Sequence, residues 1–102
     1  MDKKTIELNF QAAMASADEL DGIADELERA LRGNFEQSMT QLARSWTGAN
    51  ADYYQTKSGK LAEQIQASVS KIRTGASEVR ITARLIYQAE MAALAIAEAR
   101  NY

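Results

Sequence analysis

The sequence predicts an all-α protein: a helix-turn-helix hairpin that pairs with a second hairpin into an antiparallel four-helix bundle dimer. Three observations favour this class. The 102 residues include no proline, which would cost roughly 3 kcal/mol inside a helix. Long stretches with helical periodicity flank a central Trp46-Thr47-Gly48. Because two packed helices cover only one stripe each, a partner chain is expected to complete the core.

The chain is expected to form one domain over residues 1–102, opening with a short arm. In this arm Ile6, Leu8 and Phe10 alternate with polar residues, but the run is too short and isolated to make a sheet. The first helix is then expected over residues about 10–45.

One apolar stripe runs along this first helix. Its members recur about every 3.7 residues, close to the helical period, so one face is expected to be buried. Ser16 followed by Glu19 fits a capping box and offers an alternative start. Gly33 and Asn34 predict a weak point or slight bend, without a domain boundary. The stripe consists of Leu20, Ile23, Leu27, Leu31, Phe35, Met39, Leu42 and Trp46.

The turn is expected at residues 46–48. Gly48 stands where a chain leaving a helix needs a conformation that is closed to residues with a side chain. Trp46 is the only tryptophan, and a ring of that size is expected to pack near the turn. Two interpretations of Trp46 remain open at this point, an aromatic plug over the helix end or a recognition element.

The second helix is expected over residues about 50–99, with Asn50 as N-cap and Asp52 in the first turn. The two halves of the chain carry opposite charge. Residues 1–46 hold nine acidic and five basic side chains, whereas residues 49–102 hold five acidic and seven basic ones. An antiparallel pairing is therefore favourable, with an effect on register more than on stability.

Composition excludes several function classes. Cysteine and histidine are absent, which removes thiol chemistry, disulfides, the commonest metal ligands and the usual general base. We therefore expect no enzyme, no cofactor and no metal site. Positive charges are dispersed, which argues against nucleic acid. The apolar runs are too short for stable membrane insertion, and the first residues do not resemble a cleaved signal peptide.

The end of the second helix is expected to outrun the first and to lack cover. It carries further apolar side chains there, namely Ile81, Leu85, Met91, Leu94 and Ile96. Exposed apolar surface of this extent usually marks an interaction site, so we expect this segment to meet another protein. The alternative is a loosely ordered amphipathic tail.

A chain of this size with two helices and a central Trp-x-Gly turn resembles the WXG family, the small ESAT-like substrates of bacterial type VII (ESX) secretion. The likeness covers essentially the whole chain. Tyr54 stands eight residues after Trp46, where family members commonly carry an aromatic. Gly33 falls near a glycine often seen in the family's first helix.

The resemblance implies a small protein made in the cytoplasm and exported folded as a dimer, without a cleaved signal peptide. In the family, a Tyr-x-x-x-Asp/Glu motif after helix 2 acts with the partner's Trp-x-Gly turn as a composite signal read by the secretion ATPase. Here Glu90 stands three residues after Tyr87 instead of four. With either spacing, the tyrosine and the carboxylate lie on the same face of a helix. Trp46, Gly48, Tyr87 and Glu90 are thus implied as turn and export signal.

The implied partners are a second copy or a paralogous WXG-type hairpin, the secretion ATPase and a larger toxin that the protein escorts, unless it is itself the effector. The alternative is a helical dimerisation adaptor that is not secreted. In either case residues of both stripes are expected to form the core and dimer interface. These residues are Leu20, Ile23, Leu27, Leu31, Phe35, Leu42, Tyr54, Leu61, Ile65, Val69, Ile72, Val79 and Ile86.

Overall fold

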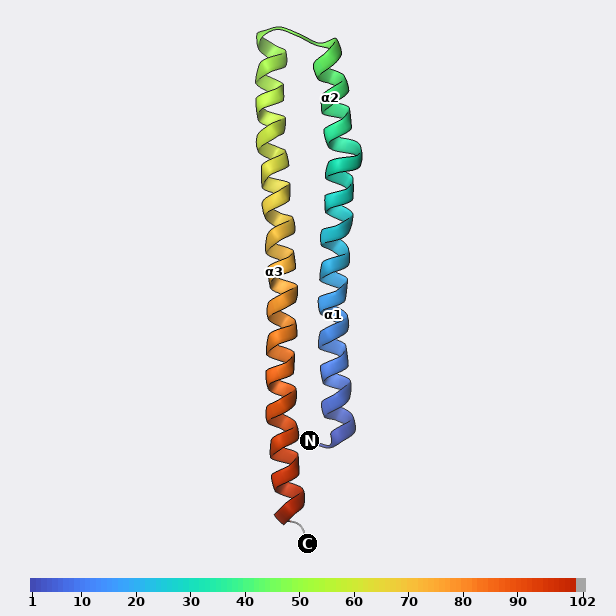
Figure 1. Cartoon of the computed structure of the whole chain (residues 1–102), viewed down its shortest axis with the longest axis vertical. Coiled ribbons are helices and arrows are strands. Elements are labelled where there is room, and N and C mark those ends of the chain that lie inside the picture. The colour runs from blue at the N-terminus through green and yellow to red at the C-terminus, as the bar shows by residue number, and fades with distance from the viewer. Residues whose placement is uncertain (101–102) are drawn as a thin grey trace. The chain divides into compact units, whose positions relative to one another are not determined.

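The computed structural model describes residues 1–100, which form helices and no strand. The predicted all-α class is confirmed, and the chain has the predicted helical hairpin character. It divides into two compact units, the turn unit (Gly22–Arg73) and the terminal unit (Met1–Asp21 with the described residues from Thr74 on). The end of the predicted tail, residues 101–102, lies outside the described residues. The elements are α1 (Lys3–Ala30), the π-helical turn η1 (Leu31–Phe35), α2 (Glu36–Ser45) and α3 (Ala49–Arg100) (Figure 1).

The predicted N-terminal arm is wrong, because α1 begins at Lys3. Asp2 caps this helix. The Thr5 backbone N–H donates to the Asp2 Oδ1 at 2.8 Å, and the Ile6 N–H donates to the Asp2 carbonyl oxygen at 3.1 Å. Hydrogen bonds from the Thr5 side chain and then from its backbone hold the pKa of the Asp2 carboxyl below its ordinary value. A carboxylate at this position also meets the positive end of the helix dipole.

The alternative start at Ser16 is wrong as well, because this residue lies within α1. Its hydroxyl donates to the Ala12 carbonyl oxygen one turn earlier, at 3.1 Å. Thr40 does the same in α2, donating to the Glu36 carbonyl oxygen at 2.9 Å. A hydroxyl that bonds back to the preceding turn is satisfied inside the helix, so it does not act as a cap.

The predicted weak point at Gly33 and Asn34 coincides with η1 in the turn unit. Here the Glu36 backbone N–H donates to the carbonyl oxygen of Leu31, five residues earlier instead of four. A glycine and an asparagine are poor helix formers, so a local departure from the α-helix costs least at this place. The helix continues through it, and no unit boundary falls there.

The extra residue of η1 changes which side chains of the turn unit are covered. Ala24 and Leu31 are buried and stand seven residues apart, but Ser38, a further seven along, is exposed. Phe35 and Met39 are half-buried instead and border a hollow whose other wall belongs to α3. The π turn therefore keeps the apolar residues of α2 directed toward α3.

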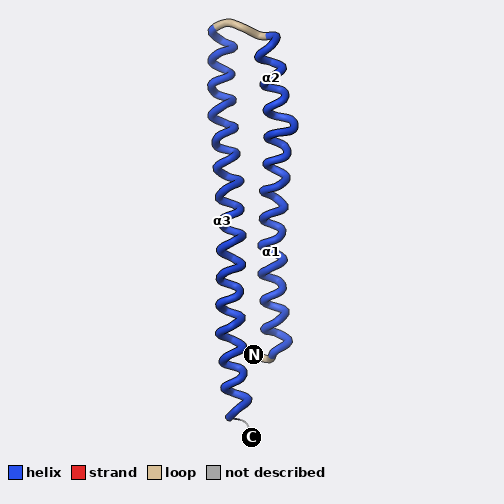
Figure 2. Tube along the Cα trace, viewed as in Figure 1, coloured by secondary structure: helices blue, strands red, loops and turns tan. Residues whose placement is uncertain are grey.

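The turn between α2 and α3 lies where the sequence predicts it (Figure 2). The Trp46 N–H donates to the Leu42 carbonyl oxygen at 2.9 Å and closes α2. Gly48 then has a φ of +110°, in the left-handed region that glycine adopts without strain. The Asp52 N–H donates to the Gly48 carbonyl oxygen at 3.0 Å, so α3 starts at once. Asn50 is already helical, and its predicted role as N-cap is wrong.

The helices of each unit meet along a line of mostly small side chains, which we call the seam. All of its members are at most 8% exposed. Small side chains allow two helix axes to approach closely, so larger aliphatic residues stand beside the seam instead of in it. The seam consists of Ile6, Ala17, Ala76 and Ala83 in the terminal unit and of Ala24, Leu31, Ala51 and Val69 in the turn unit.

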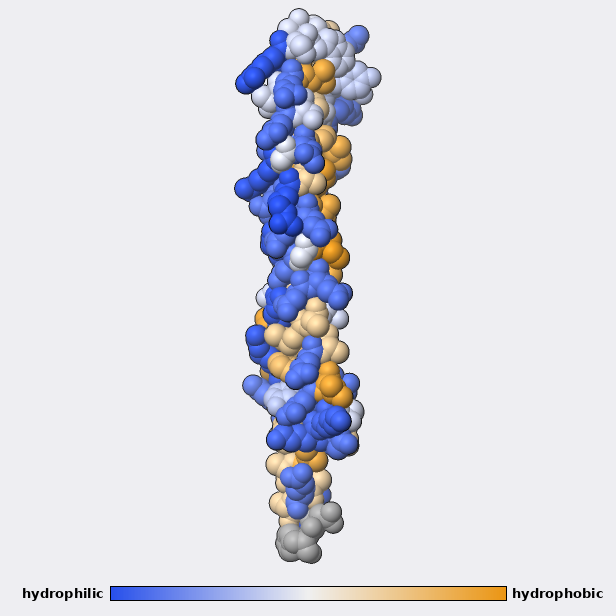
Figure 3. Space-filling model, turned by 90° about the vertical axis from the view of Figure 1, so that its right-hand side faces the viewer, coloured by the Kyte–Doolittle hydropathy of each residue, from blue (hydrophilic) through white to orange (hydrophobic). Residues whose placement is uncertain are grey.

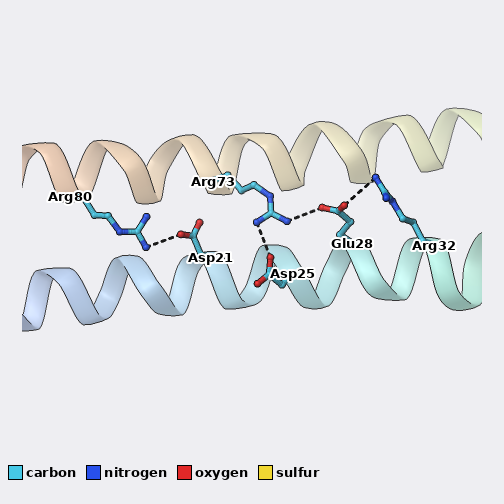
Figure 4. A network of polar contacts seen from close by, with 6 residues as sticks. All are labelled: Asp21, Asp25, Glu28, Arg32, Arg73 and Arg80. Carbon is cyan, nitrogen blue, oxygen red and sulfur yellow. Dashed lines mark hydrogen bonds and ion pairs between the residues drawn. The ribbon is translucent and has the colours of Figure 1, made fainter.

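In each unit an arginine of α3 bridges two carboxylates of α1. Figure 4 shows the contacts of Arg73 and the contact of Arg80 with Asp21. The predicted attraction between the acidic first half and the basic second half thus takes the form of specific pairs. Because their side chains are partly in water, these pairs fix register more than they add stability. The pairs join Arg80 to Asp18 and Asp21 in the terminal unit and Arg73 to Asp25 and Glu28 in the turn unit, at N–O distances of 2.7 to 2.9 Å.

Glu28 makes stability depend on acidity. The hydrogen bond from Arg73, and then the charge of Arg32 at 3.1 Å, lower the pKa of its carboxyl below the ordinary 4.5. Because the folded pKa is the lower one, this contribution is fully present above about pH 4.5 and is lost as the pH falls through the folded value. We expect Glu28→Gln to flatten part of the decline in thermal midpoint between about pH 6 and pH 3. Glu63→Gln, at an exposed position of α3, is the control, and equal declines in all three proteins would contradict the assignment.

Candidate functional site

An aromatic cluster lies at the turn and is formed by Trp46, Tyr53 and Tyr54; we call it the turn cluster. The Trp46 and Tyr54 rings are 5.4 Å apart between centroids and tilted by 33°. Tyr53 meets Tyr54 edge-on, with centroids 5.7 Å apart. The Lys57 Nζ lies 5.6 Å from the centre of the Tyr53 ring, within range of a cation–π interaction. Trp46 and the first turns of α3 thus form one continuous aromatic surface.

The turn cluster is largely open to solvent. Trp46 is 38% exposed, and the two tyrosines are each more than half exposed. The Trp46 ring packs against Tyr54 near the turn, and part of it is open to solvent. Exposed aromatic rings with polar tips are the side chains that most often anchor protein–protein contacts, since each supplies a large apolar area.

Helical periodicity alone does not identify two residues of this aromatic surface. Tyr53 and Lys57 lie off the apolar stripe of the second helix, so helical periodicity assigns them to the solvated face. The sequence signal that could identify these two residues is their position close to Tyr54 in the sequence. Tyr53 adjoins Tyr54, and Lys57 stands four residues after Tyr53, one helical turn away.

The Tyr87 and Glu90 pair lies on α3 in the terminal unit, and both residues are half-buried. The Tyr87 ring packs against that of Phe10 on α1, with centroids 4.8 Å apart and an interplanar angle of 39°. Glu90 borders the same hollow, which has a volume of about 210 Å³. The sequence places Tyr87 and Glu90 on one face, and the structure adds Phe10 as their neighbour.

The expectation that the end of the second helix lacks cover is wrong for Met91 and Leu94, which are half-buried. The early start of α1 brings the first residues of the chain alongside α3, and Met1 and Ile6 border a hollow of about 330 Å³ together with Leu94 and Ala97. The other three residues named in the expectation are each more than half exposed, as expected: Ile81, Leu85 and Ile96.

In each unit a second candidate surface, which we call the apolar edge of that unit, flanks the seam on the side opposite the arginine pairs. On α1, the helical period places two aliphatic residues on one side of Ala24 and two carboxylates on the other. The aliphatic residues are Ile23 and Leu27, and the carboxylates are Asp25 and Glu28. On α3, Ile72 lies across the seam from Arg73 in the same way. Because the two sets of charged residues meet on one side, the aliphatic residues share the other. The apolar edge comprises Ile23, Leu27, Leu61, Ile65 and Ile72 in the turn unit and Leu20, Val79 and Ile86 in the terminal unit.

In the upper part of Figure 3, which belongs to the turn unit, apolar residues follow one edge of the view beside strongly hydrophilic ones. In the terminal unit, Leu20, Val79 and Ile86 border an open groove of about 510 Å³. Most of the residues expected in the core and interface therefore remain at least partly accessible. Leu31 and Val69 are buried; Leu20, Phe35, Leu42, Ile65, Ile72 and Val79 are half-buried; Ile23, Leu27, Tyr54, Leu61 and Ile86 are exposed.

The described residues hold no group of three or more acidic side chains placed to bind a metal ion together. Over the same part of the chain, none of the helices combines the length and the hydropathy that crossing a membrane requires.

The four residues implied as turn and export signal are divided between the units. Trp46 and Gly48 belong to the turn unit, where Trp46 meets Tyr54, whereas Tyr87 and Glu90 belong to the terminal unit, where Tyr87 meets Phe10. Comparison with known proteins supplies no further assignment: no family model, no curated protein and no solved structure matches this chain.

Proposed function

We propose that this protein is a small secreted protein of the WXG type, which is exported folded by a bacterial type VII secretion system. It pairs antiparallel with a second hairpin, a copy of itself or a related chain, in a four-helix bundle. It acts through protein–protein contacts, as an effector or as the escort of a larger toxin.

The apolar edge is the observation that carries this proposal. The seam buries few large side chains, and burying one aliphatic side chain contributes only about 1.5–3 kcal/mol. Ile23, Leu61 and Ile86 meanwhile remain about half exposed. A second hairpin laid along the apolar edge covers these residues and supplies the missing layer of a bundle. The arginine pairs, on the other side of the seam, stay in water.

The turn cluster and the Tyr87–Glu90 pair support the secretion part of the proposal. Trp46 is exposed enough to be read by another protein, and it is held in place by Tyr54. Tyr87 and Glu90 stand one turn apart on α3 and present a phenol and a carboxylate on the same face. In this proposal the secretion ATPase reads the pair together with the turn cluster of the partner hairpin.

Trp46→Ala tests the role of the turn cluster. Because the indole is partly in water and packs mainly on Tyr54, we expect helicity to be kept and export through the type VII system to fall sharply. A fully buried aromatic would instead cost about 3–5 kcal/mol on truncation. Export is measured by comparing culture supernatant with cell lysate, and helicity by circular dichroism of the purified chain.

Thr47→Ala is the matched control, since it changes an exposed neighbour in the same turn. Normal export of Trp46→Ala would contradict its role in the signal, and loss of helicity would assign the residue to the core. A stable dimer that is never exported from cells carrying the secretion system would favour the adaptor that stays inside the cell.

A further inference from the structure

The Tyr87–Glu90 pair is bordered on both sides by the beginning of α1. On one side, Phe10 packs on the Tyr87 ring at 4.8 Å, and Asn9 lines the same hollow. On the other side, Met1 lines the second hollow, which Glu90 also borders. Ile6 is 2% exposed and lines both hollows. The pair is thus set into a surface made by two chain segments that are far apart in the sequence.

The α1 side of this surface is itself anchored. The Asp2 cap satisfies the Thr5 N–H and holds the first turn of α1 in helical geometry. Burial of Ile6 then fixes that turn against α3. Phe10 follows Ile6 by four residues, so it lies on the same face of α1, one turn further on. The position of the Phe10 ring is therefore determined by the fold of the terminal unit.

We infer that Phe10 is a positioning residue for Tyr87, and that the partner reads the Tyr87–Glu90 pair as part of a folded surface built from residues 6–10 and 87–90. This inference rests on the proposed function and adds that the partner recognises the Tyr87–Glu90 signal in the folded protein. The packed Phe10 ring limits the side-chain rotamers of Tyr87, which holds the Tyr87 ring at the hollow that Glu90 also borders.

A folded presentation also accounts for the spacing of three residues between Tyr87 and Glu90. An extended peptide presents side chains by their order, so a spacing of three differs from a spacing of four. On a helix both spacings return to the same face within one turn. A partner that recognises a helical surface therefore meets the same pair of groups with either spacing.

Phe10→Ala, compared with Phe10→Leu, tests the inference. An aromatic pair contributes about 0.5–1.5 kcal/mol, so we expect Phe10→Ala to weaken binding to the purified ATPase domain of the type VII system about 2- to 10-fold. Phe10→Leu, which refills the space, is expected to restore part of the binding. Leu8→Ala changes a residue of α1 that is 54% exposed and serves as the control.

A peptide of residues 83–102 provides a second measurement that does not depend on how the variants fold. If the folded surface is read, this peptide competes poorly with the whole chain for the ATPase domain. Equal competition by the peptide would overturn the inference. Unchanged binding by Phe10→Ala, with Tyr87→Ala inactive, would also overturn it while leaving the proposed function in place. Normal binding and export of Tyr87→Ala would instead refute the signal that the proposed function assigns.

Discussion

Leu31→Ala is expected to destabilise the protein by about 2–5 kcal/mol, the range for removing a buried leucine side chain. Leu31 is 4% exposed and is one of the few large side chains in the seam. Its carbonyl oxygen also accepts the hydrogen bond from the Glu36 N–H that spans five residues in η1. Alanine is the better helix former, so any loss of stability reflects packing and not helix propensity.

Thermal unfolding followed by circular dichroism measures this effect. For a domain of this size, such a loss lowers the thermal midpoint by about 10 °C or more. Leu85→Ala is the matched control, because Leu85 is 61% exposed and lies on α3 away from the seam. If both variants lower the midpoint equally, the seam is not where the stability of the hairpin resides.

Replacing Ile23 and Leu27 together by lysine is expected to dissociate the proposed dimer while leaving the helices intact. The two residues stand one turn apart on the apolar edge of α1, at 49% and 38% exposure. Because less than half of each side chain remains to be covered, burying the rest of both contributes about 1.5–3 kcal/mol per hairpin, so their loss weakens association about 10- to 10²-fold. Lysine is a good helix former, which protects the secondary structure.

Light scattering over a range of concentrations measures the change in mass. Ile81→Lys with Leu85→Lys is the charge-matched control, since these residues also stand one turn apart and are 54% and 61% exposed. They lie on α3 away from the apolar edge, and this double variant is expected to remain a dimer. A well-folded monomer before any substitution, at micromolar concentration, would exclude the dimer altogether.

Local patterns were sufficient to predict the helices and the turn. The helical period indicates two long helices, and a glycine after Trp46 identifies the one place within residues 1–100 where the backbone takes a positive φ. The start of α1 differs from the prediction because Ile6, Leu8 and Phe10 also fit a period of two. Ile6 and Phe10 also stand four residues apart, and Asp2 ahead of them is a helix cap.

The core was predicted less well, for a physical reason. Periodicity identifies large aliphatic residues, but two helices in close contact bury small ones at the line of closest approach. Ala24 and Ala76 are fully buried, whereas Ile23 and Leu27 are substantially exposed. Local sequence patterns also do not predict the pairing of Phe10 with Tyr87, because it joins residues at opposite ends of the sequence.

The π turn has a further consequence for any helix that lies beside the first one. The average spacing of about 3.7 residues in the apolar stripe combines an ordinary α-helical period with one inserted residue. Ala24 and Leu31 belong to one phase of the seven-residue repeat, and Met39 belongs to the next. α3 has no such interruption from Ala49 to Arg100, yet its Val69 is buried in the same seam as Leu31, and α3 also forms the other wall of the hollow that Met39 borders. The single added residue at η1 thus lets one unbroken helix stay in register with apolar side chains on both sides of the π turn.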